Sequence, residues 1–131
     1  MRKIKAVTLQ ELLVALIIIG ILMLISIPIL MPLISKTRST EAQYQLGYIH
    51  TLEKNHFYMY SRYTTDFEEL GYEHVVLVSE GGNGNYIIEI TEASVNEFKA
   101  KATAIVDFDG DGVFNVWEID QDNKLREVVK D

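Results

Sequence analysis

The chain begins with a long uninterrupted apolar stretch. From Leu12 to Ser35 no residue is charged, and 19 of these 24 residues are Ala, Val, Ile, Leu or Met. At about 1.5 Å per residue, a helix of this length spans roughly 36 Å, enough to cross a hydrocarbon core of about 30 Å. The pattern therefore predicts a membrane-spanning helix, in which Gly20, Pro28 and Pro32 weaken the helical backbone.

Beyond Pro32 the pattern becomes that of an amphipathic helix, which we expect to continue to about Tyr60. Apolar positions recur at helical spacing and form one stripe, with Glu53 beside it: Ala42, Leu46, Ile49, Leu52 and His56. A helix that runs from the apolar stretch to Tyr60 is too long for a small globular domain. We therefore expect only its second half to pack on a sheet.

The remainder of the chain carries a short helix signal and then strand signals. Thr65–Glu68 has the spacing of a capping box, and Gly71 can end a short helix. Five runs separated by Gly, Asn and Asp turns have strand patterns: Val75–Ser79, Tyr86–Thr91, Phe98–Phe108, Val113–Ile119 and Leu125–Val129. The predicted fold class is α+β, with the long helix packed on an antiparallel sheet of four to five strands within about residues 75–130.

Charge divides the chain at the same place as hydropathy. Residues 1–40 carry five bases and one acid, whereas residues 41–131 carry seven bases and 18 acids. Such an acidic domain repels phosphate, which argues against nucleic-acid binding. The chain has no cysteine, so neither disulfides nor thiolate chemistry is available. Because no nucleophile–base motif or phosphate-binding loop is present either, we expect no enzymatic activity.

One acid near the start of the apolar stretch needs an explanation. Glu11 lies where burial would cost a carboxylate up to about 3 kcal/mol at bilayer depth. A plain anchor does not require this acid, although a position at headgroup level is the simpler alternative. A secretory signal peptide would have a shorter apolar run and a small-residue cleavage site. The bases Arg2, Lys3 and Lys5 favour a cytoplasmic N-terminus with the acidic domain outside.

The segment Lys5-Ala6-Val7-Thr8-Leu9-Gln10-Glu11-Leu12-Leu13-Val14 resembles the processing region of type IV prepilins and of the pseudopilins of type II secretion. In that family a prepilin peptidase removes a short basic leader on the cytoplasmic side and methylates the new N-terminal amine. The resemblance implies cleavage between Ala6 and Val7, with Val7 methylated. The family more often has Gly and Phe at these two places.

The resemblance also implies how the chain assembles. The carboxylate of Glu11 would pair with the Val7 amine of a neighbouring subunit, and the backbone from Gly20 to Pro28 would unwind as subunits pack. The implied organisation is a leader at residues 1–6, a transmembrane and filament-core helix at 7–35, and a head domain at 36–131. Its partners would be copies of itself, the prepilin peptidase and an inner-membrane assembly platform.

Three functional interpretations follow. The first is the structural subunit of a type IV pilus-like filament, inserted in the inner membrane with its head outside. The second is a major pseudopilin, which forms a short periplasmic pseudopilus. The lack of cysteine and the acidic loop at residues 107–118 favour this interpretation. The third is a single-pass anchored domain that binds calcium or a partner and does not polymerise.

The acidic loop has the spacing of an EF-hand, D-x-D-x-D-G-x5-E, with an asparagine at the ninth place. Its oxygen-bearing side chains are those that Ca²⁺ prefers: Asp107, Asp109, Asp111, Asn115 and Glu118. The flanking residues, however, have strand patterns, and Asp-Gly repeats are also strong hairpin turns. A calcium site and a plain turn therefore both remain open.

Overall fold

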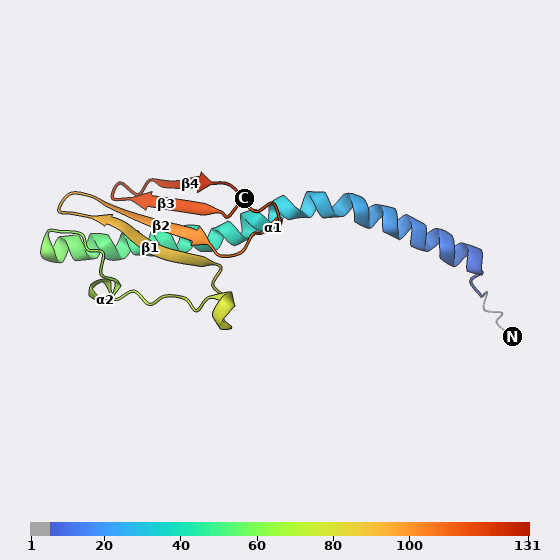
Figure 1. The fold of residues 1–131 in the computed structure, drawn as a ribbon, viewed down its shortest axis with the longest axis horizontal. Helices are drawn as coiled ribbons and strands as arrows, with labels where there is room; N and C mark the ends of the chain where they lie inside the picture. The colour runs from blue at the N-terminus through green and yellow to red at the C-terminus, as the bar shows by residue number, and fades with distance from the viewer. Residues whose placement is uncertain (1–5) are drawn as a thin grey trace. The chain divides into compact units, whose positions relative to one another are not determined.

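The computed structural model describes residues 6–131, which fall into two compact units (Figure 1). The first unit ends at Leu33 and the second comprises Ile34–Asp131. Of the predicted leader, residues 1–5 lie outside the described residues. One helix, α1 (Leu9–Tyr60), contributes residues to both units. Its end at Tyr60 confirms the sequence prediction, and Pro28 and Pro32 both lie inside it.

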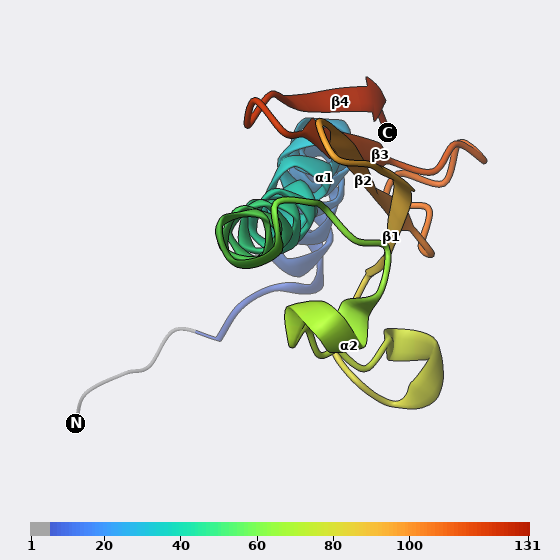
Figure 2. The ribbon, with the colours of Figure 1, turned by 90° about the vertical axis from the view of Figure 1, so that its left-hand side faces the viewer.

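The second unit has an α+β fold, as predicted. Four strands form one antiparallel sheet in the order of the chain: β1 (Tyr86–Ala93), β2 (Phe98–Ala104), β3 (Val116–Asp120) and β4 (Leu125–Val129). Figure 2 looks nearly along the second half of α1 and shows the strands gathered on one side of it. The edge strand β4 has the predicted bounds.

The core lies between α1 and the inward face of the sheet. The helix contributes Ala42, Leu46 and Ile49, all fully buried. Strand β2 alternates buried and half-buried residues along its whole length, and three of its four buried side chains are alanines. Because an alanine projects little from the sheet, this strand leaves room for the larger helix side chains. The strand predicted to begin at Phe98 is thereby confirmed as far as Ala104.

The strand predicted at Val75–Ser79 is wrong. The chain forms instead a short 3₁₀ helix, η1 (Val78–Glu80), and an isolated bridge between Leu77 and Gly84. The backbone bonds of this segment are local: the Val78 amide donates to Gly84 and the Gly82 amide to Leu77. A turn rich in glycine thus satisfies these groups within itself, and the segment does not join the sheet.

Four strand bounds and one stripe position also differ from the prediction. Strand β1 ends at Ala93 rather than Thr91, and β3 ends at Asp120 rather than Ile119. Strand β2 ends at Ala104 and β3 begins only at Val116, because the acidic loop occupies the residues between them. On α1, Glu53 is fully buried whereas Leu52 is half-buried. The helical spacing from Ile49 places position 53, four residues on, at the centre of the buried face.

The predicted short helix is α2 (Phe67–Leu70), with a different cap from the one expected. The side chain of Asp66, rather than Thr65, accepts a hydrogen bond from the Glu68 amide. Gly71 adopts the left-handed conformation, φ 71°, and its amide bonds the carbonyl of Glu68.

Candidate functional site

The N-terminal end of α1 is closed by a capping box. The Thr8 hydroxyl accepts a hydrogen bond from the Glu11 amide at 3.2 Å, and the Glu11 carboxylate accepts one from the Thr8 amide at 3.0 Å. Thr8 is the residue before α1, and Glu11 is its third residue, so two otherwise unpaired amides are satisfied reciprocally. From the sequence we expected Glu11 either to act in assembly or to lie at headgroup level, and the spacing T-x-x-E at residues 8–11 also signals this cap.

The predicted cleavage position lies just outside the helix. Ala6 and Val7 have no regular secondary structure, and the Val7 side chain is 70% exposed. A peptide bond outside a helix can be drawn into a protease without breaking helical hydrogen bonds. The local structure at Ala6 and Val7 is therefore accessible to a processing enzyme.

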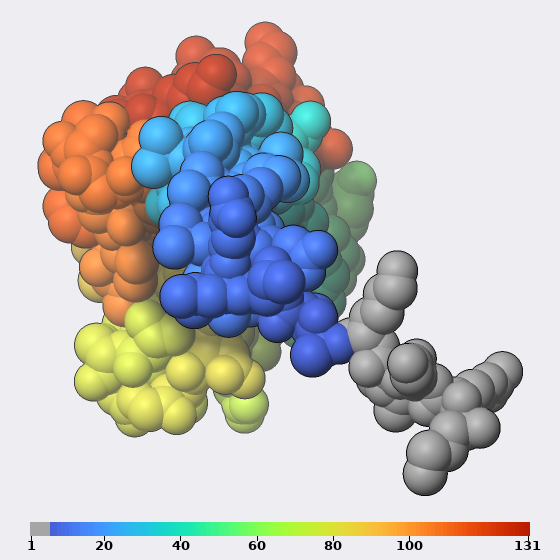
Figure 3. All heavy atoms as spheres, turned by 90° about the vertical axis from the view of Figure 1, so that its right-hand side faces the viewer, coloured from blue at the N-terminus to red at the C-terminus, as the bar shows by residue number. Residues whose placement is uncertain are grey.

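The apolar stretch of α1 is long and apolar enough to cross a membrane, and none of its most apolar window is buried within the chain. Large aliphatic side chains from Leu12 to Ile34 stand exposed all around it (Figure 3, blue). Gly20 and Pro28 lie within this helical stretch, and no side chain approaches Gly20. A helix that is apolar on every side requires either lipid or other helices around it.

The acidic loop between β2 and β3 brings some of its predicted ligands together. One carboxylate oxygen from each of Asp107, Asp109 and Asp111 lies within 4.8 Å of the others, and Asp131 joins them. Asp107 accepts from the amides of Gly110 and Gly112, at 2.7 and 2.6 Å, and these bonds lower its pKa. The loop is thereby wound around an ionised Asp107.

The other two predicted ligands lie elsewhere. Asn115 is fully buried; its side chain accepts from the Tyr86 hydroxyl at 2.7 Å and donates to Glu127. Glu118 is a residue of β3 and lies 4.0 Å from Arg126 on β4. The strand that begins at Val116 thus carries the last part of the EF-hand pattern away from the loop.

Asp131 was not predicted as part of this cluster. Its Oδ2 accepts from the Phe108 amide at 3.0 Å, whereas its Oδ1 is buried without a hydrogen-bond partner. No ion pair joins any of the four acids to a Lys or Arg in the part of the chain that the structure describes. Four carboxylates this close repel one another, and a divalent cation would offset that repulsion.

A fully buried acid lies under the connection between α1 and α2. Glu53 is fully buried; its Oε2 accepts from the Thr64 amide at 3.1 Å, and its Oε1 has no partner. Burial raises the pKa of Glu53 to about 7, although the Thr64 bond and nearby His56 act in the opposite direction. His56 contacts the Arg62 carbonyl at 2.8 Å and Glu69 at 3.3 Å. Together these side chains fasten the connection to the helix.

Comparison with models of known protein families gives no match, and no curated protein sequence matches the chain.

Proposed function

We propose that this chain is the structural subunit of a type IV pilus-like filament, processed after Ala6 and assembled through the first half of α1. The observation that carries the proposal is an apolar helix, uncovered by the chain itself, with a single acid at its N-terminal end. In a bundle of such helices the apolar surfaces cover one another, and a stagger of about one turn between neighbours would bring each Glu11 level with a Val7 amine. A filament therefore accounts for both the exposed apolar surface of the helix and the acid at its N-terminal end.

The capping box adds a step to this mechanism. Because the Thr8 amide holds the Glu11 carboxylate at the end of the helix, the acid is positioned before a neighbour arrives. An ionised carboxylate has about four acceptor sites, so this one bond leaves capacity for a methylated amine. Substitution of Glu11 tests the proposal, because an acid that only caps its own helix can be replaced by a neutral cap.

The alternatives keep the same membrane helix. A major pseudopilin would form short periplasmic filaments, and imaging cells for extended surface fibres separates it from a pilus subunit. An anchored domain that never polymerises would leave the apolar helix to lipid alone. That alternative gives no role to a carboxylate at the helix end beyond the cap.

We further propose that the head binds Ca²⁺ at Asp107, Asp109, Asp111 and Asp131. The buried, unpartnered Oδ1 of Asp131 supports this proposal, because an unsatisfied anionic oxygen beside three other carboxylates fits a hard cation. The ion would cancel negative charge and tie the acidic loop to the chain after β4. There the Asp131 carbonyl also accepts from Ser35 of α1, at 2.7 Å.

Calcium is expected to raise the melting temperature of the full chain in detergent by at least about 4 °C relative to excess chelator. That is the shift which about 1 kcal/mol produces in a domain of this size. The fluorescence of Trp117, the one tryptophan, reports the transition. The double substitution Asp109→Asn and Asp111→Asn should abolish the increase, whereas Asp122→Asn, in the exposed β3–β4 turn, should retain it. Equal melting temperatures of the wild-type chain with calcium and chelator would contradict the site.

A further inference from the structure

The short segment that contains α2 is held on α1 by two buried titratable side chains, Glu53 and His56. The Oε2 atom of Glu53 accepts a hydrogen bond from the Thr64 amide at 3.1 Å. The Nε2 atom of His56 lies 3.3 Å from the Oε2 atom of Glu69 in α2. Glu53 and His56 are three residues apart, so they lie on one face of α1, about one turn apart. We call residues 64–71 the α2 segment, which these two contacts attach to α1.

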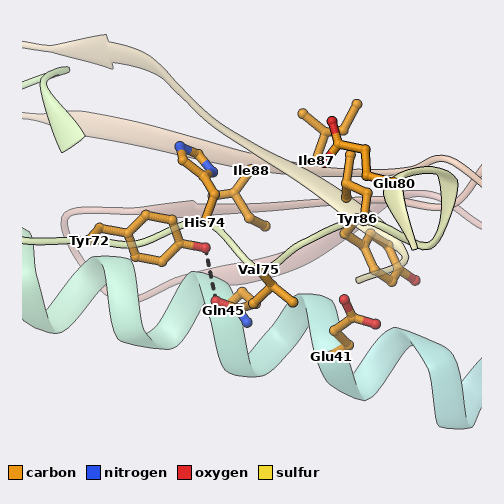
Figure 4. A pocket seen from close by; sticks show the side chains of 10 residues that line it. Glu41, Gln45, Tyr72, His74, Val75, Glu80, Tyr86, Ile87 and Ile88 are labelled. Atoms are coloured by element: carbon orange, nitrogen blue, oxygen red, sulfur yellow. Dashed lines mark hydrogen bonds between the residues drawn. The ribbon is translucent and has the colours of Figure 1, made fainter. Parts of the chain in front are cut away.

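Two tyrosines fix the chain on either side of the α2 segment. Tyr63 is 5% exposed, and its amide donates to the Ser94 carbonyl at 3.0 Å. Tyr72 is 6% exposed, and its hydroxyl donates to Gln45 of α1 at 2.9 Å, the dashed line in Figure 4. The residues between these two anchors can therefore leave α1 while both ends stay attached. Opening of such a short segment does not require unfolding of the sheet.

The contacts of His56 require a proton on each of its ring nitrogens. Nδ1 lies 2.8 Å from the Arg62 carbonyl, which can only accept a hydrogen bond. The carboxylate of Glu69, beside Nε2, also only accepts when it is ionised. The Arg62 guanidinium lies 3.6 Å from the same oxygen of Glu69 and favours that ionised form. Loss of a proton from His56 therefore places a lone pair against the Glu69 carboxylate and breaks this contact.

The contacts of Glu53 favour its protonated form. Its Oε1 atom is buried without a hydrogen-bond partner, so ionisation leaves negative charge there without compensation. Burial raises the pKa of Glu53 to about 7, although the Thr64 bond and the charge of His56 act in the opposite direction. Glu53 forms no ion pair within residues 6–131, and the neighbouring base, Lys54, donates instead to the Tyr63 hydroxyl at 3.0 Å. Between about pH 4.5 and 7, Glu53 therefore holds its proton only while the α2 segment covers it.

We propose that Glu53 and His56 form a proton-dependent latch, which keeps the α2 segment on α1 while both side chains are protonated and lets the segment open once either loses its proton. An ionised Glu53 gains water only when Thr64 moves away from it. A neutral His56 no longer attracts Glu69. Both losses of a proton occur as the pH rises, so both weaken the closed form in the same direction. The latch lies wholly within the second unit, so it does not depend on filament formation.

Hydrogen exchange of the Thr64 amide, measured by NMR on the full chain in detergent micelles, reports opening of the latch. An open α2 segment exposes Glu53, whose pKa then returns to the reference value of 4.5, so the open form binds fewer protons than the closed form. Opening is therefore favoured as the pH rises towards 7, and the effect of Glu53 levels off above it. After correction for the intrinsic exchange rate, we expect the opening equilibrium to increase at least about tenfold between pH 6 and pH 8. An opening equilibrium that stays constant over this interval would overturn the proposal.

Low concentrations of urea distinguish local opening from unfolding of the whole head. Opening of the α2 segment exposes little surface, so we expect exchange of the Thr64 amide to be nearly independent of urea. The amides of β2, a strand inside the sheet, exchange only when the head unfolds and should depend steeply on urea. If the Thr64 amide has the same protection and the same urea dependence as β2, the latch has no opening of its own and the proposal fails.

The variant Glu53→Gln tests the first contact of the latch. Glutamine keeps an oxygen that can accept from the Thr64 amide but has no ionisable proton. We therefore expect the opening equilibrium to rise less with pH in Glu53→Gln than in the wild-type chain. An equal rise in both chains would contradict the role of Glu53.

The variant Glu69→Gln tests the second contact at a side chain that is 41% exposed, outside the core. We expect the Thr64 amide to open about twofold to fivefold more often at pH 6, the size of one partly exposed charge pair. Glu68→Gln is the matched control, because Glu68 is the neighbouring exposed acid of α2 and forms no ion pair in the described part of the chain. It should leave exchange of the Thr64 amide unchanged. Equal effects of the two variants would show that the general charge of α2 matters rather than its contact with His56, and would refute the latch.

Discussion

We expect replacement of Glu11 by alanine to abolish the proposed filament assembly, while the proposed cleavage after Ala6 and methylation of Val7 continue. A carboxylate at bilayer depth is stable only when a cation lies beside it, and loss of one partner from a buried ion pair costs about 3–5 kcal/mol. The peptide bond between Ala6 and Val7, where cleavage is proposed, lies outside α1. The substitution at position 11 therefore leaves the residues on both sides of that bond unchanged. Electron microscopy of cells that produce the variant, with intact mass of the extracted subunit, measures both outcomes.

Two further substitutions separate the charge of Glu11 from its cap. Glu11→Gln preserves a side chain that can accept from the Thr8 amide but has no charge, so we expect it to process normally and to form no filaments. Thr8→Ala removes the hydroxyl that accepts from the Glu11 amide and retains the charge, so we expect filaments with a helix end destabilised by about 1 kcal/mol. Normal filaments from Glu11→Gln would reduce Glu11 to a helix cap and refute the pairing mechanism.

We expect Glu53→Gln to remove the loss of stability that Glu53 itself causes in the head as pH rises from about 4.5 to 8. The folded pKa of about 7 lies above the reference value of 4.5, so the unfolded chain releases this proton first. Unfolding is therefore favoured progressively as pH rises through this interval, and the cost levels off above pH 7. At about 1.4 kcal/mol per pKa unit, the wild-type chain loses about 3 kcal/mol through Glu53.

Urea titrations of the full chain in detergent, followed by Trp117 fluorescence at several pH values, measure this difference. The Gln variant retains an oxygen that can accept from the Thr64 amide, so it tests the charge rather than the bond. Glu68→Gln, an exposed acid of α2, serves as the control and should follow the wild-type pH profile. If the free energy of unfolding falls equally with pH in wild type and in Glu53→Gln, then burial does not raise the pKa of Glu53.

The parts of the fold that the sequence predicted are those governed by local periodicity. The helix ends at Tyr60, about one turn after the last stripe position at His56, and β4 has its predicted bounds because turn residues precede it. The inward alanines of β2 follow from strict alternation. In each case neighbouring residues along the chain carry the signal, so no knowledge of tertiary contacts is needed.

The rest depends on contacts between distant residues. Nothing near Asp131 in the sequence indicates that its carboxylate lies beside Asp107, because β3 and β4 bring it there. The run Val75–Ser79 has strand composition, but its glycine-rich neighbour satisfies its backbone locally. Glu53 continues the helical spacing from Ile49, which is a local signal that its side chain is buried. Because Glu53 is charged, the sequence placed it beside the stripe, whereas the fold buries it against Thr64.

We propose that the chain is a processed subunit that begins at Val7, two residues before α1. Intact mass spectrometry of the protein extracted from the membranes of cells with an active prepilin peptidase tests it most directly. The expected mass corresponds to a chain that begins at Val7 and carries one added methyl group. A chain that retains Met1 to Ala6, without the methyl group, would contradict the claim.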